Sequence, residues 1–562
     1  MFSRPVVVIS GKTGSGKSGL TGLLEREYQF RAIRSRELLA AQAGTSDRAT
    51  LLARGRELDQ TTGYRWAADE TIDIIARLPE YQGVVIDHVT SPAQVEAFRR
   101  KFGSALLHVH LWASAQTLRT RYGDELGREV DAETYATIDH LRDDSLVVAL
   151  KRDADVRINT DRCDARDTLV QVAAHLRLFT PPDVRCVDVI IGGQYGSEGK
   201  GNVVGYLARE YDVMVRVGGP NAGHTVASVD GPYTYHHLPS GSRDVSARIL
   251  LGPGMTIWLE GLQKEILECR ITRDRLFIDP QALIIEPSDR DAEKSSVVGA
   301  IGSTGSGSGF AAARRITERG KGTVRLARDV AELAEYVGHP GAWRGSTVDR
   351  LEDAYRAGQS ILLEGTQGSG LSTFHGHYPH VTSRDTNVAG CLAEAGISPS
   401  RVRKILMVIR PMPIRVDNPD GDEGRSSGPL KHETTFDAIA EWSELDADAL
   451  KAAEKTSTTN RKRRVGWFEW EQFRKACALN APTDIVLAFA DYVRKSNRNA
   501  RRFEQLDERT IRFIENLERV SQAPVSLINT RFPREDDGTG DLRTVIDRRT
   551  WTALRSKDRD AS

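Results

Sequence analysis

The stretch IGGQYGSEGKGN, from Ile191 to Asn202, ends an apolar run and has the composition of a loop that holds phosphate. Its glycines let backbone N–H groups approach phosphate oxygens, and Lys200 adds a positive charge. A second loop of this kind, GKTGSGKS, spans Gly11 to Ser18. Each loop follows a β-branched run typical of a buried strand. The chain is therefore predicted to contain two α/β units, each with a nucleotide site at the end of a strand.

The loop from Gly11 to Ser18 matches the pattern GxxxxGK[ST] and lies between a predicted strand and a predicted helix, the context that this motif requires. We expect Gly11, Gly14, Gly16 and Lys17 to hold phosphates. The Ser18 hydroxyl is expected to be a ligand of Mg²⁺.

Strand-like and helix-like segments alternate as far as residue 178, which is typical of a parallel α/β sheet. Asp87 ends one apolar run and is predicted to order Mg²⁺ or to act as a base, with a strand-capping role as the alternative. Residues 1–179 resemble the small P-loop kinases of nucleoside monophosphates and dephospho-coenzyme A. Those kinases usually place an arginine after the acidic strand, where this chain has Val89 and Thr90, so the acceptor of this unit stays open. Residues 180–183, TPPD, are expected to be a linker, and residues 184–562 a larger α/β domain.

Composition favours small-molecule partners. The formal net charge is zero, which gives no attraction to nucleic acids or acidic membranes. The five cysteines are far apart and contain no CxxC pair, so neither a disulfide framework nor a zinc site is predicted. No stretch approaches about 18 apolar residues, and a cytoplasmic enzyme without a membrane segment is expected.

The larger domain contains five further ordered motifs, and together with the loop at 191–202 they resemble those of the adenylosuccinate synthetases, in particular the compact archaeal and phage branches, over residues 184–550. The motifs are GGPNAGHT (218–225), HHLPSGS (236–242), GSTGSGSG (302–309), EGTQGSGLSTFHGHYPHVTSRDT (364–386) and TSTTNRKRRVGW (456–467). The resemblance implies a homodimeric ligase that joins L-aspartate to C6 of a purine monophosphate. GTP or ATP would first phosphorylate O6, and the aspartate amine would then displace the phosphate. Within these motifs, HGHYPH and RKRR are not expected to mark a metal cluster or a nucleic-acid site.

The resemblance also implies roles for single residues. His224 would be the catalytic histidine, Lys200 would neutralise the transferring phosphoryl group, and the carbonyl of Gly223 would bind Mg²⁺. The residues expected to hold the purine monophosphate and aspartate are Gln194, Asn221, Thr304, Gln367, Thr382, Thr459, Arg461 and Arg463. Those expected at the energy donor are Gly196, Gly199, Gly201 and Asp491.

Two positions depart from the family pattern. Ser197 stands where the common enzyme has an aspartate that takes the N1 proton of hypoxanthine and helps to bind Mg²⁺. A serine is small and uncharged and leaves room for an amine at C2, so GMP or dGMP is the favoured acceptor and IMP the alternative, with Glu198 as a possible substitute base. Phe489 replaces a lysine near Asp491, which leaves the choice between GTP and ATP open. A nucleotide sensor without turnover is the competing hypothesis from another class.

Overall fold

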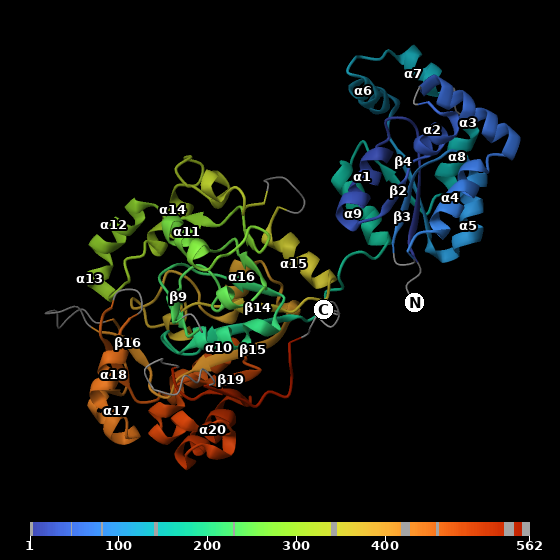
Figure 1. Cartoon of the computed structure of the whole chain (residues 1–562). Coiled ribbons are helices and arrows are strands. Elements are labelled where there is room, and N and C mark those ends of the chain that lie inside the picture. Colours follow the sequence, from blue (N-terminus) through green and yellow to red (C-terminus); the bar gives the residue numbers. More distant parts are fainter. Residues whose placement is uncertain are drawn as a thin grey trace. The chain divides into compact units, whose positions relative to one another are not determined.

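In a computed structural model, the described residues are 4–45, 48–79, 82–139, 144–228, 231–338, 345–417, 427–456, 460–532 and 544–553. The chain divides into two compact units, Met1–Phe179 and Thr180–Ser562 (Figure 1). We call them unit 1 and unit 2 and describe each by itself.

Unit 1 contains a five-stranded sheet in the order β2-β3-β1-β4-β5 with every pair parallel. The predicted P-loop-containing parallel sheet is therefore confirmed. The strands are β1 (Val6–Ser10), β2 (Arg31–Ile33), β3 (Val84–Val89), β4 (Leu106–Trp112) and β5 (Val156–Asn159). The helices are α1 (Lys17–Tyr28), α2 (Ser35–Ala43), α3 (Arg48–Thr62), α4 (Trp66–Ala76), α5 (Pro92–Phe102), α6 (Ala115–Leu126), α7 (Ala132–Asp139), α8 (Asp144–Asp153) and α9 (Ala165–His175).

The run VVVI at the start of β1 explains why helices cover both faces of this sheet. Side chains alternate between the faces of a strand, so a continuously apolar strand needs an apolar layer on each side. Val7 and Ile9 pack with α1 and α9 on one face, and Val6 and Val8 pack with α4, α5 and α8 on the other. These two helical layers flank the sheet in Figure 1.

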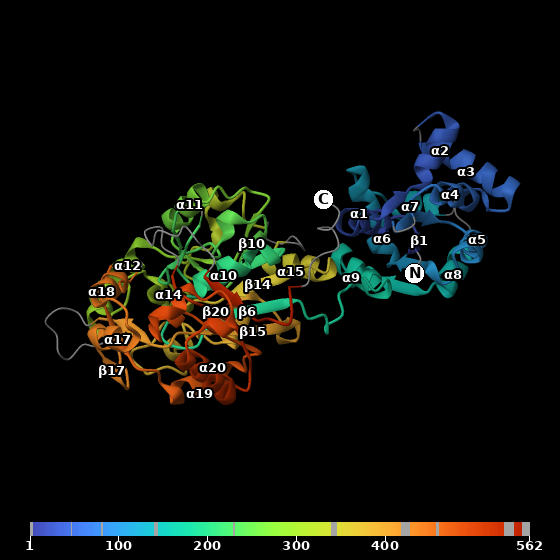
Figure 2. The same cartoon turned by 60° about the horizontal axis from the view of Figure 1, so that its bottom comes forward.

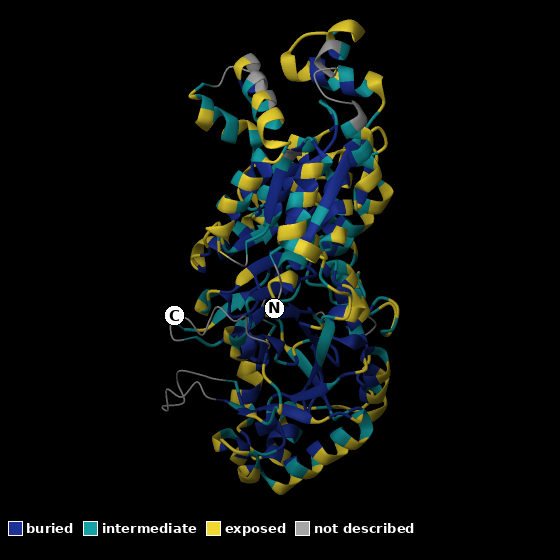
Figure 3. Ribbon diagram, turned by 90° about the vertical axis from the view of Figure 1, so that its right-hand side faces the viewer, coloured by how far each residue is buried: buried dark blue, intermediate teal, exposed yellow. Residues whose placement is uncertain are grey.

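Unit 2 contains a nine-stranded sheet in the order β12-β10-β7-β14-β6-β15-β19-β20-β21. Its pairs are parallel except that β21 runs antiparallel to β20. The strands are β6 (Val187–Gly192), β7 (Val213–Arg216), β10 (Arg248–Leu251), β12 (Leu276–Ile278), β14 (Ile361–Glu364), β15 (Val402–Ile409), β19 (Asp484–Leu487), β20 (Val525–Asn529) and β21 (Val545–Asp547). The central strands are buried and form the core of the unit. Buried residues are dark blue in Figure 3.

Smaller sheets and helices surround this core. β8 (His224–Val226) pairs with β9 (Tyr233–Tyr235), β11 (Thr256–Ile257) with β13 (Leu283–Ile284), and β18 (Arg463–Gly466) lies between β16 (Ile414–Val416) and β17 (Glu433–Thr434). The helices are α10 (Lys200–Leu207), α11 (Leu259–Glu268), α12 (Pro287–Ser296), α13 (Val298–Ile301), α14 (Ser308–Thr317), α15 (Thr347–Arg356), α16 (Val388–Ala395), α17 (Phe436–Ser443), α18 (Ala447–Ala453), α19 (Trp470–Asn480) and α20 (Glu508–Ser521). Figure 2 shows α19 and α20 beside each other.

Candidate active site

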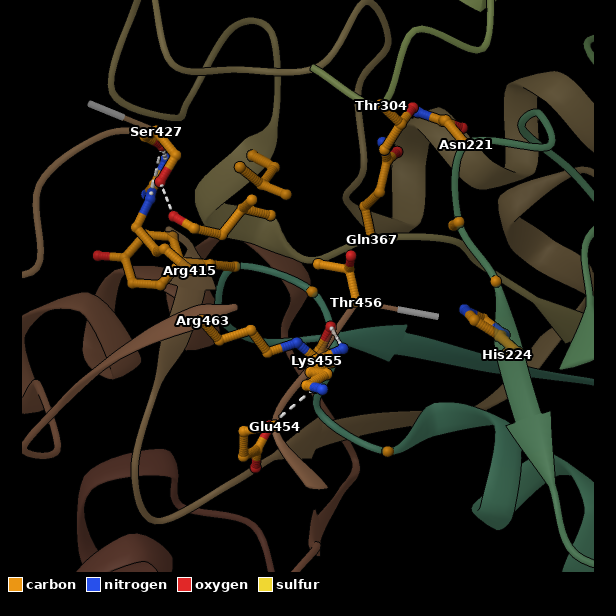
Figure 4. Close-up of a pocket in the computed structure, with 18 of the residues that line it drawn as sticks. Asn221, His224, Thr304, Gln367, Arg415, Ser427, Glu454, Lys455, Thr456 and Arg463 are labelled. Carbon is orange, nitrogen blue, oxygen red and sulfur yellow. Dashed lines mark hydrogen bonds and ion pairs between the residues drawn. The ribbon is translucent and has the colours of Figure 1, made fainter. Parts of the chain in front are cut away.

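A cavity of about 850 Å³ opens in unit 2 where loops leave the ends of the parallel strands. The loop after β6 and the segments that carry Asn221, Thr304, Gln367 and Arg463 all contribute to its wall (Figure 4). Loops at the carboxyl ends of strands are the usual place for a ligand site in a parallel α/β sheet. The motifs that are far apart in the sequence therefore meet in one site.

Backbone strain marks the same cavity. Ser197, Gln367 and Phe489 have φ values of 55°, 63° and 56°, a region that side chains other than glycine rarely adopt. The other described non-glycine residues with positive φ lie at or just after helix ends or, in the case of Asn460, in a turn. All three strained residues line the cavity, which supports a functional reason for keeping them.

The side chain of Glu198 binds the backbone of the loop after β6 and fixes its conformation. This side chain is fully buried, and it accepts hydrogen bonds from the backbone N–H of Gln194 at 3.0 Å and of Gly196 at 2.8 Å. Its other oxygen lies 2.6 Å from the Nζ atom of Lys200. Lys200 lines the cavity at the start of α10, whereas Glu198 does not. Gly199 precedes this helix with φ 91°, a conformation that glycine adopts without steric cost.

His224 is oriented by a buried carboxylate. Its Nδ1 atom lies 2.6 Å from Glu364 Oε1, and Glu364 Oε2 lies 2.8 Å from Arg216 Nη1. Ser240 also donates its backbone N–H and its hydroxyl to Glu364. Burial, with the Arg216 charge as the next cause, lowers the pKa of His224 to about 4, while the positive groups around Glu364 lower the pKa of that carboxyl. The imidazole is therefore neutral near neutral pH, and it donates the proton on Nδ1 to the ionised Glu364.

Asn221 Oδ1, Thr304 Oγ1 and Gln367 Oε1 are among the cavity-lining polar atoms that are buried without a hydrogen-bond partner in the described part of the chain. Gln367 donates from Nε2 to Thr382 Oγ1 at 2.8 Å, which leaves its carbonyl oxygen as an acceptor. Figure 4 shows Asn221 and Thr304 next to each other with Gln367 nearby. Buried polar groups normally have partners, so this set indicates a polar ligand.

Arg463, which also lines the cavity, lies between Glu454 and Ser197. Its Nη1 atom lies 2.7 Å from Glu454 Oε2, and its Nη2 donates to Ser197 Oγ at 3.2 Å. Glu454 also pairs with Arg410 at 2.6 Å and accepts the hydroxyl proton of Tyr492. Burial and these arginines act in opposite directions on Glu454, and the arginines lower its pKa to about 2. Glu454 is therefore ionised and holds Arg463 towards Ser197.

The remaining predicted residues of unit 2 differ in where they lie. Gly196, Gly199, Gly201, Gly223, Thr382 and Asp491 line the cavity. Gln194 does not, because its side-chain amide exchanges hydrogen bonds with the backbone of Arg410. Arg461 donates to the carbonyl of Asp417 and is not part of the wall. Thr459 lies outside the described residues.

The first loop has the backbone conformation of a phosphate loop. Gly14 and Gly16 have φ values of 81° and 95°, and a side chain at Gly14 would meet the carbonyl oxygen of Leu118 at 2.4 Å. Lys17 donates from Nζ to the carbonyl oxygens of Gly11 and Lys12 at 2.9 and 2.8 Å. Ser18 is exposed in the first turn of α1.

Asp87 lies in the second half of β3, where it accepts the backbone N–H of Ser35 at 3.2 Å. Burial raises the pKa of Asp87, while this hydrogen bond and the charge of Lys17 oppose that rise. The charge of Lys17 acts on Asp87, so the carboxyl group and the phosphate loop lie near each other.

Sequence reasoning missed Glu364 and Glu454 as supporting residues of the cavity. Glu364 ends the buried strand ILLE, and an acid at the end of an apolar strand was the available signal. Glu454 directly follows α18 and carries no local signal, because its partners Arg410 and Arg463 come from other segments of the chain.

A model of the adenylosuccinate synthetase family matches residues 189–339 and 324–498. The chain belongs to the adenylosuccinate synthetase family. It is 33% identical over 349 residues to the adenylosuccinate synthetase of Methanocaldococcus jannaschii, which covers 61% of this chain and 93% of the relative. Unit 2 is therefore a carbon–nitrogen ligase of purine nucleotide synthesis, and members of this family use a nucleoside monophosphate, aspartate and a nucleoside triphosphate.

Two solved structures of the family are similar to this chain. The succinoaminodeoxyadenylate synthetase of cyanophage S-2L, bound to dGMP and to dATP as an energy donor, is 29% identical with a TM-score of 0.52, and the match covers 65% of this chain and 96% of the phage enzyme. The fully ligated adenylosuccinate synthetase of Plasmodium falciparum is 20% identical with a TM-score of 0.53 and covers 65% of this chain and 100% of that enzyme, which supports the fold.

Within the described parts of the chain, no helix combines the length and the apolar character needed to cross a bilayer. The same described residues contain no group of three or more histidine, cysteine or acidic side chains placed to hold a metal ion.

Proposed function

We propose that unit 2 joins L-aspartate to C6 of a guanine nucleoside monophosphate, GMP or dGMP. The observation that carries this proposal is Ser197, a small and uncharged residue in the cavity wall where the common enzymes of the family have an aspartate. The proposal is also supported by the cyanophage relative, whose structure contains dGMP.

The chemistry proceeds in two balanced steps. The O6 atom of the purine attacks the γ-phosphorus of the donor, which forms a 6-phosphoryl purine and releases a nucleoside diphosphate. The amine of aspartate then attacks C6, and inorganic phosphate leaves with the former O6. The protons lost from N1 and from the amine pass to a base or to water. Lys200 neutralises charge on the transferring phosphoryl group, a contribution that is larger in a cavity that excludes water.

His224 serves as the acid at O6. With Nδ1 bonded to Glu364, only Nε2 can donate to a ligand, and it carries a proton only when the ring is an imidazolium. Anionic phosphates in the cavity favour that charged form and raise the pKa of His224 from its low value in the free protein. The histidine thus becomes an acid when the donor is bound.

Mg²⁺ fits this site as an ion held mainly by the phosphates. It prefers oxygen ligands and keeps few protein contacts in such enzymes. Gly223 and Ser197 line the cavity, and the carbonyl of Gly223 and the hydroxyl of Ser197 would provide these contacts. When bound, the ion would offset charge on the phosphates.

Ser197 determines the acceptor in this account. Its Oγ atom accepts a hydrogen bond from Arg463 and has no carboxylate to take the N1 proton. The smaller side chain leaves room for the C2 amine of guanine, and the acceptor oxygen of Gln367 suits a base N–H group. Arg463, fixed by Glu454, has the planar pair of donors that a carboxylate of aspartate requires. The two oxygens of Glu198 bind the loop backbone and Lys200, so we assign this residue a positioning role.

A mass-resolved product assay tests the proposal. The protein receives L-aspartate, Mg²⁺ and ATP or GTP, with IMP, GMP and dGMP offered separately. A succinyl adduct from GMP or dGMP but not from IMP is expected. An adduct from IMP alone would mean ordinary adenylosuccinate synthesis, and nucleotide binding without any adduct would favour a sensor.

A second proposal concerns unit 1: it transfers phosphate to a nucleoside monophosphate made downstream of the ligase. The phosphate loop, Lys17 and the nearby Asp87 support this proposal. Lys17→Ala should abolish nucleotide kinase activity and leave the rate of succinyl adduct formation unchanged. Kinase activity that survives this substitution would contradict the proposal. We also expect a homodimer, which light scattering would test.

A further inference from the structure

One end of the cavity has the chemistry of a site for a nucleotide base. Its wall contains the aromatic side chains of Phe489, Tyr492 and Phe532. The Phe489 backbone is strained at φ 56°, and the Arg410 guanidinium lies 4.8 Å from the centre of its ring. A phenylalanine is rarely kept in this conformation without a functional reason. The assignment of this end to the base of the energy donor rests on the ligase function proposed for unit 2.

Asp491 is the acid in this part of the wall. It is 3% exposed, and its Oδ1 atom is buried without a hydrogen-bond partner among the described residues. The other oxygen, Oδ2, accepts a hydrogen bond from Arg498 Nε at 3.1 Å. The backbone N–H of Asp491 donates to the carbonyl of Thr530, which fixes the position of the side chain. The structure therefore offers a ligand one free acceptor from this carboxylate.

We propose that Arg498 sets the choice of the energy donor by occupying one oxygen of Asp491, so that the site takes an adenine nucleotide in preference to a guanine nucleotide. Arg498 follows in the short helix η9 (Lys495–Asn499) and lines the cavity beside Asp491.

The edges of the two bases explain the preference. Guanine presents two adjacent N–H donors, at N1 and at the C2 amine, and needs both oxygens of a carboxylate. Adenine presents a single amine at C6, which one oxygen satisfies. A buried N–H group left without an acceptor lowers affinity by roughly tenfold or more.

Three other side chains on this wall, Phe489, Tyr492 and Lys495, do not offset that loss for guanine. The carbonyl at C6 of guanine needs a donor, and Phe489 has none. Tyr492 already donates its hydroxyl proton to Glu454. Lys495 lines the cavity but is exposed, so its hydrogen bonds compete with water.

A competition assay tests the role of Arg498. All variants carry Lys17→Ala, so that unit 1 consumes neither ATP nor the monophosphate. ATP and GTP are supplied together at equal concentration with dGMP, aspartate and Mg²⁺, and the ratio of ADP to GDP is measured by mass spectrometry. This ratio does not depend on how much of a variant is folded, because both donors compete for the same molecules.

We expect ADP to exceed GDP by about tenfold or more in the Lys17→Ala protein, and Arg498→Ala to lower the ratio by about tenfold. Arg494→Ala is the matched control, since it removes a nearby cation that pairs with Glu444 and leaves Arg498 bonded to Asp491, and it should leave the ratio unchanged. An excess of GDP in the Lys17→Ala protein, or a ratio that Arg498→Ala does not change, would overturn the inference.

Failure of the ligase function gives a different result. If no succinyl adduct forms with any acceptor, that function fails. Equilibrium dialysis of the Lys17→Ala and Lys17→Ala/Arg498→Ala proteins with the β,γ-imido analogues of ATP and GTP then decides the base preference by itself. Tighter binding of the ATP analogue, reduced by Arg498→Ala, supports the inference, and equal or tighter binding of the GTP analogue overturns it.

Discussion

The Nδ1 atom of His224 lies 2.6 Å from Glu364 Oε1, and both side chains are buried in unit 2. This contact fixes the ring orientation and leaves Nε2 as the only nitrogen that can serve a ligand. It also supplies the negative charge that opposes the lowering of the His224 pKa by burial. Glu364 therefore controls both the direction and the protonation of the proposed catalytic acid.

Glu364→Gln should lower kcat by up to roughly a hundred- to ten-thousandfold, the contribution that general acid–base catalysis typically makes. The neutral amide no longer stabilises the imidazolium, so the pKa of His224 in the bound enzyme falls. The acid form is lost as pH rises, and the descending limb of the kcat–pH profile should move to lower pH in the variant. Steady-state rates measured across this pH range check the expectation.

Glu265→Gln provides the matched control for that experiment. Glu265 lies 2.9 Å from His237 Nδ1 in a second buried pair of the same unit. This variant loses a buried contact and is expected to keep the wild-type pH limb. A Glu364→Gln enzyme whose rate falls without any movement of the limb would show that Glu364 is only structural.

Thr304→Val should raise KM for the purine monophosphate by about tenfold. The Oγ1 atom of Thr304 is buried and has no hydrogen-bond partner among the described residues, so we expect it to bind the monophosphate. The aspartate KM should change little. Thr317→Val is the control, since Thr317 donates to the carbonyl of Ala313 on an exposed part of α14. Equal KM values in the two variants would show that Thr304 does not bind the monophosphate.

Unit 1 should lose stability below neutral pH. Ser10 Oγ lies 2.7 Å from His108 Nε2 and 2.9 Å from His110 Nδ1, and burial lowers the pKa of each histidine from 6.5 to about 4. The unfolded chain binds protons that the folded unit does not, so stability is full above the unfolded pKa and is lost as pH falls from about 6.5 to about 4.

Calorimetry between these pH values measures this effect as a falling melting temperature of the unit 1 transition. His110→Gln should make the fall less steep even if it lowers the melting temperature at neutral pH. The exposed His175 offers a control, and His175→Gln should keep the wild-type slope. A slope that is the same in all three proteins would contradict the assignment to the buried pair.

Much of the fold is encoded in local sequence. The run from Val6 to Ser10 and the run from Val187 to Gly192 are apolar enough to require burial on both faces, and the glycine loops after them favour a helix as the next element of each unit. The ordered motifs also identify most of the cavity wall, because catalytic loops must lie at the ends of these strands.

The supporting contacts could not be predicted in the same way. The pairing of Glu454 with Arg410 and Arg463 depends on three distant segments meeting, and no spacing in the sequence encodes it. Gln194 lies in the right loop, yet its amide serves the backbone of Arg410 instead of a ligand. A motif gives the place of a residue along the loop, whereas packing decides which way its side chain points.

The central claim is that Ser197 selects a guanine acceptor, and Ser197→Asp tests it most directly. The measurement is the ratio of kcat/KM for dGMP to kcat/KM for IMP in the wild-type, Ser197→Asp and Ser197→Asn proteins, with the succinyl adduct followed by mass. A carboxylate at this position can take the N1 proton of hypoxanthine, whereas the uncharged asparagine cannot. We predict that the wild type prefers dGMP by at least about tenfold. The Ser197→Asn protein should still prefer dGMP, and the Ser197→Asp protein should prefer IMP. A wild-type protein that prefers IMP, or a ratio that aspartate leaves unchanged, would contradict the account.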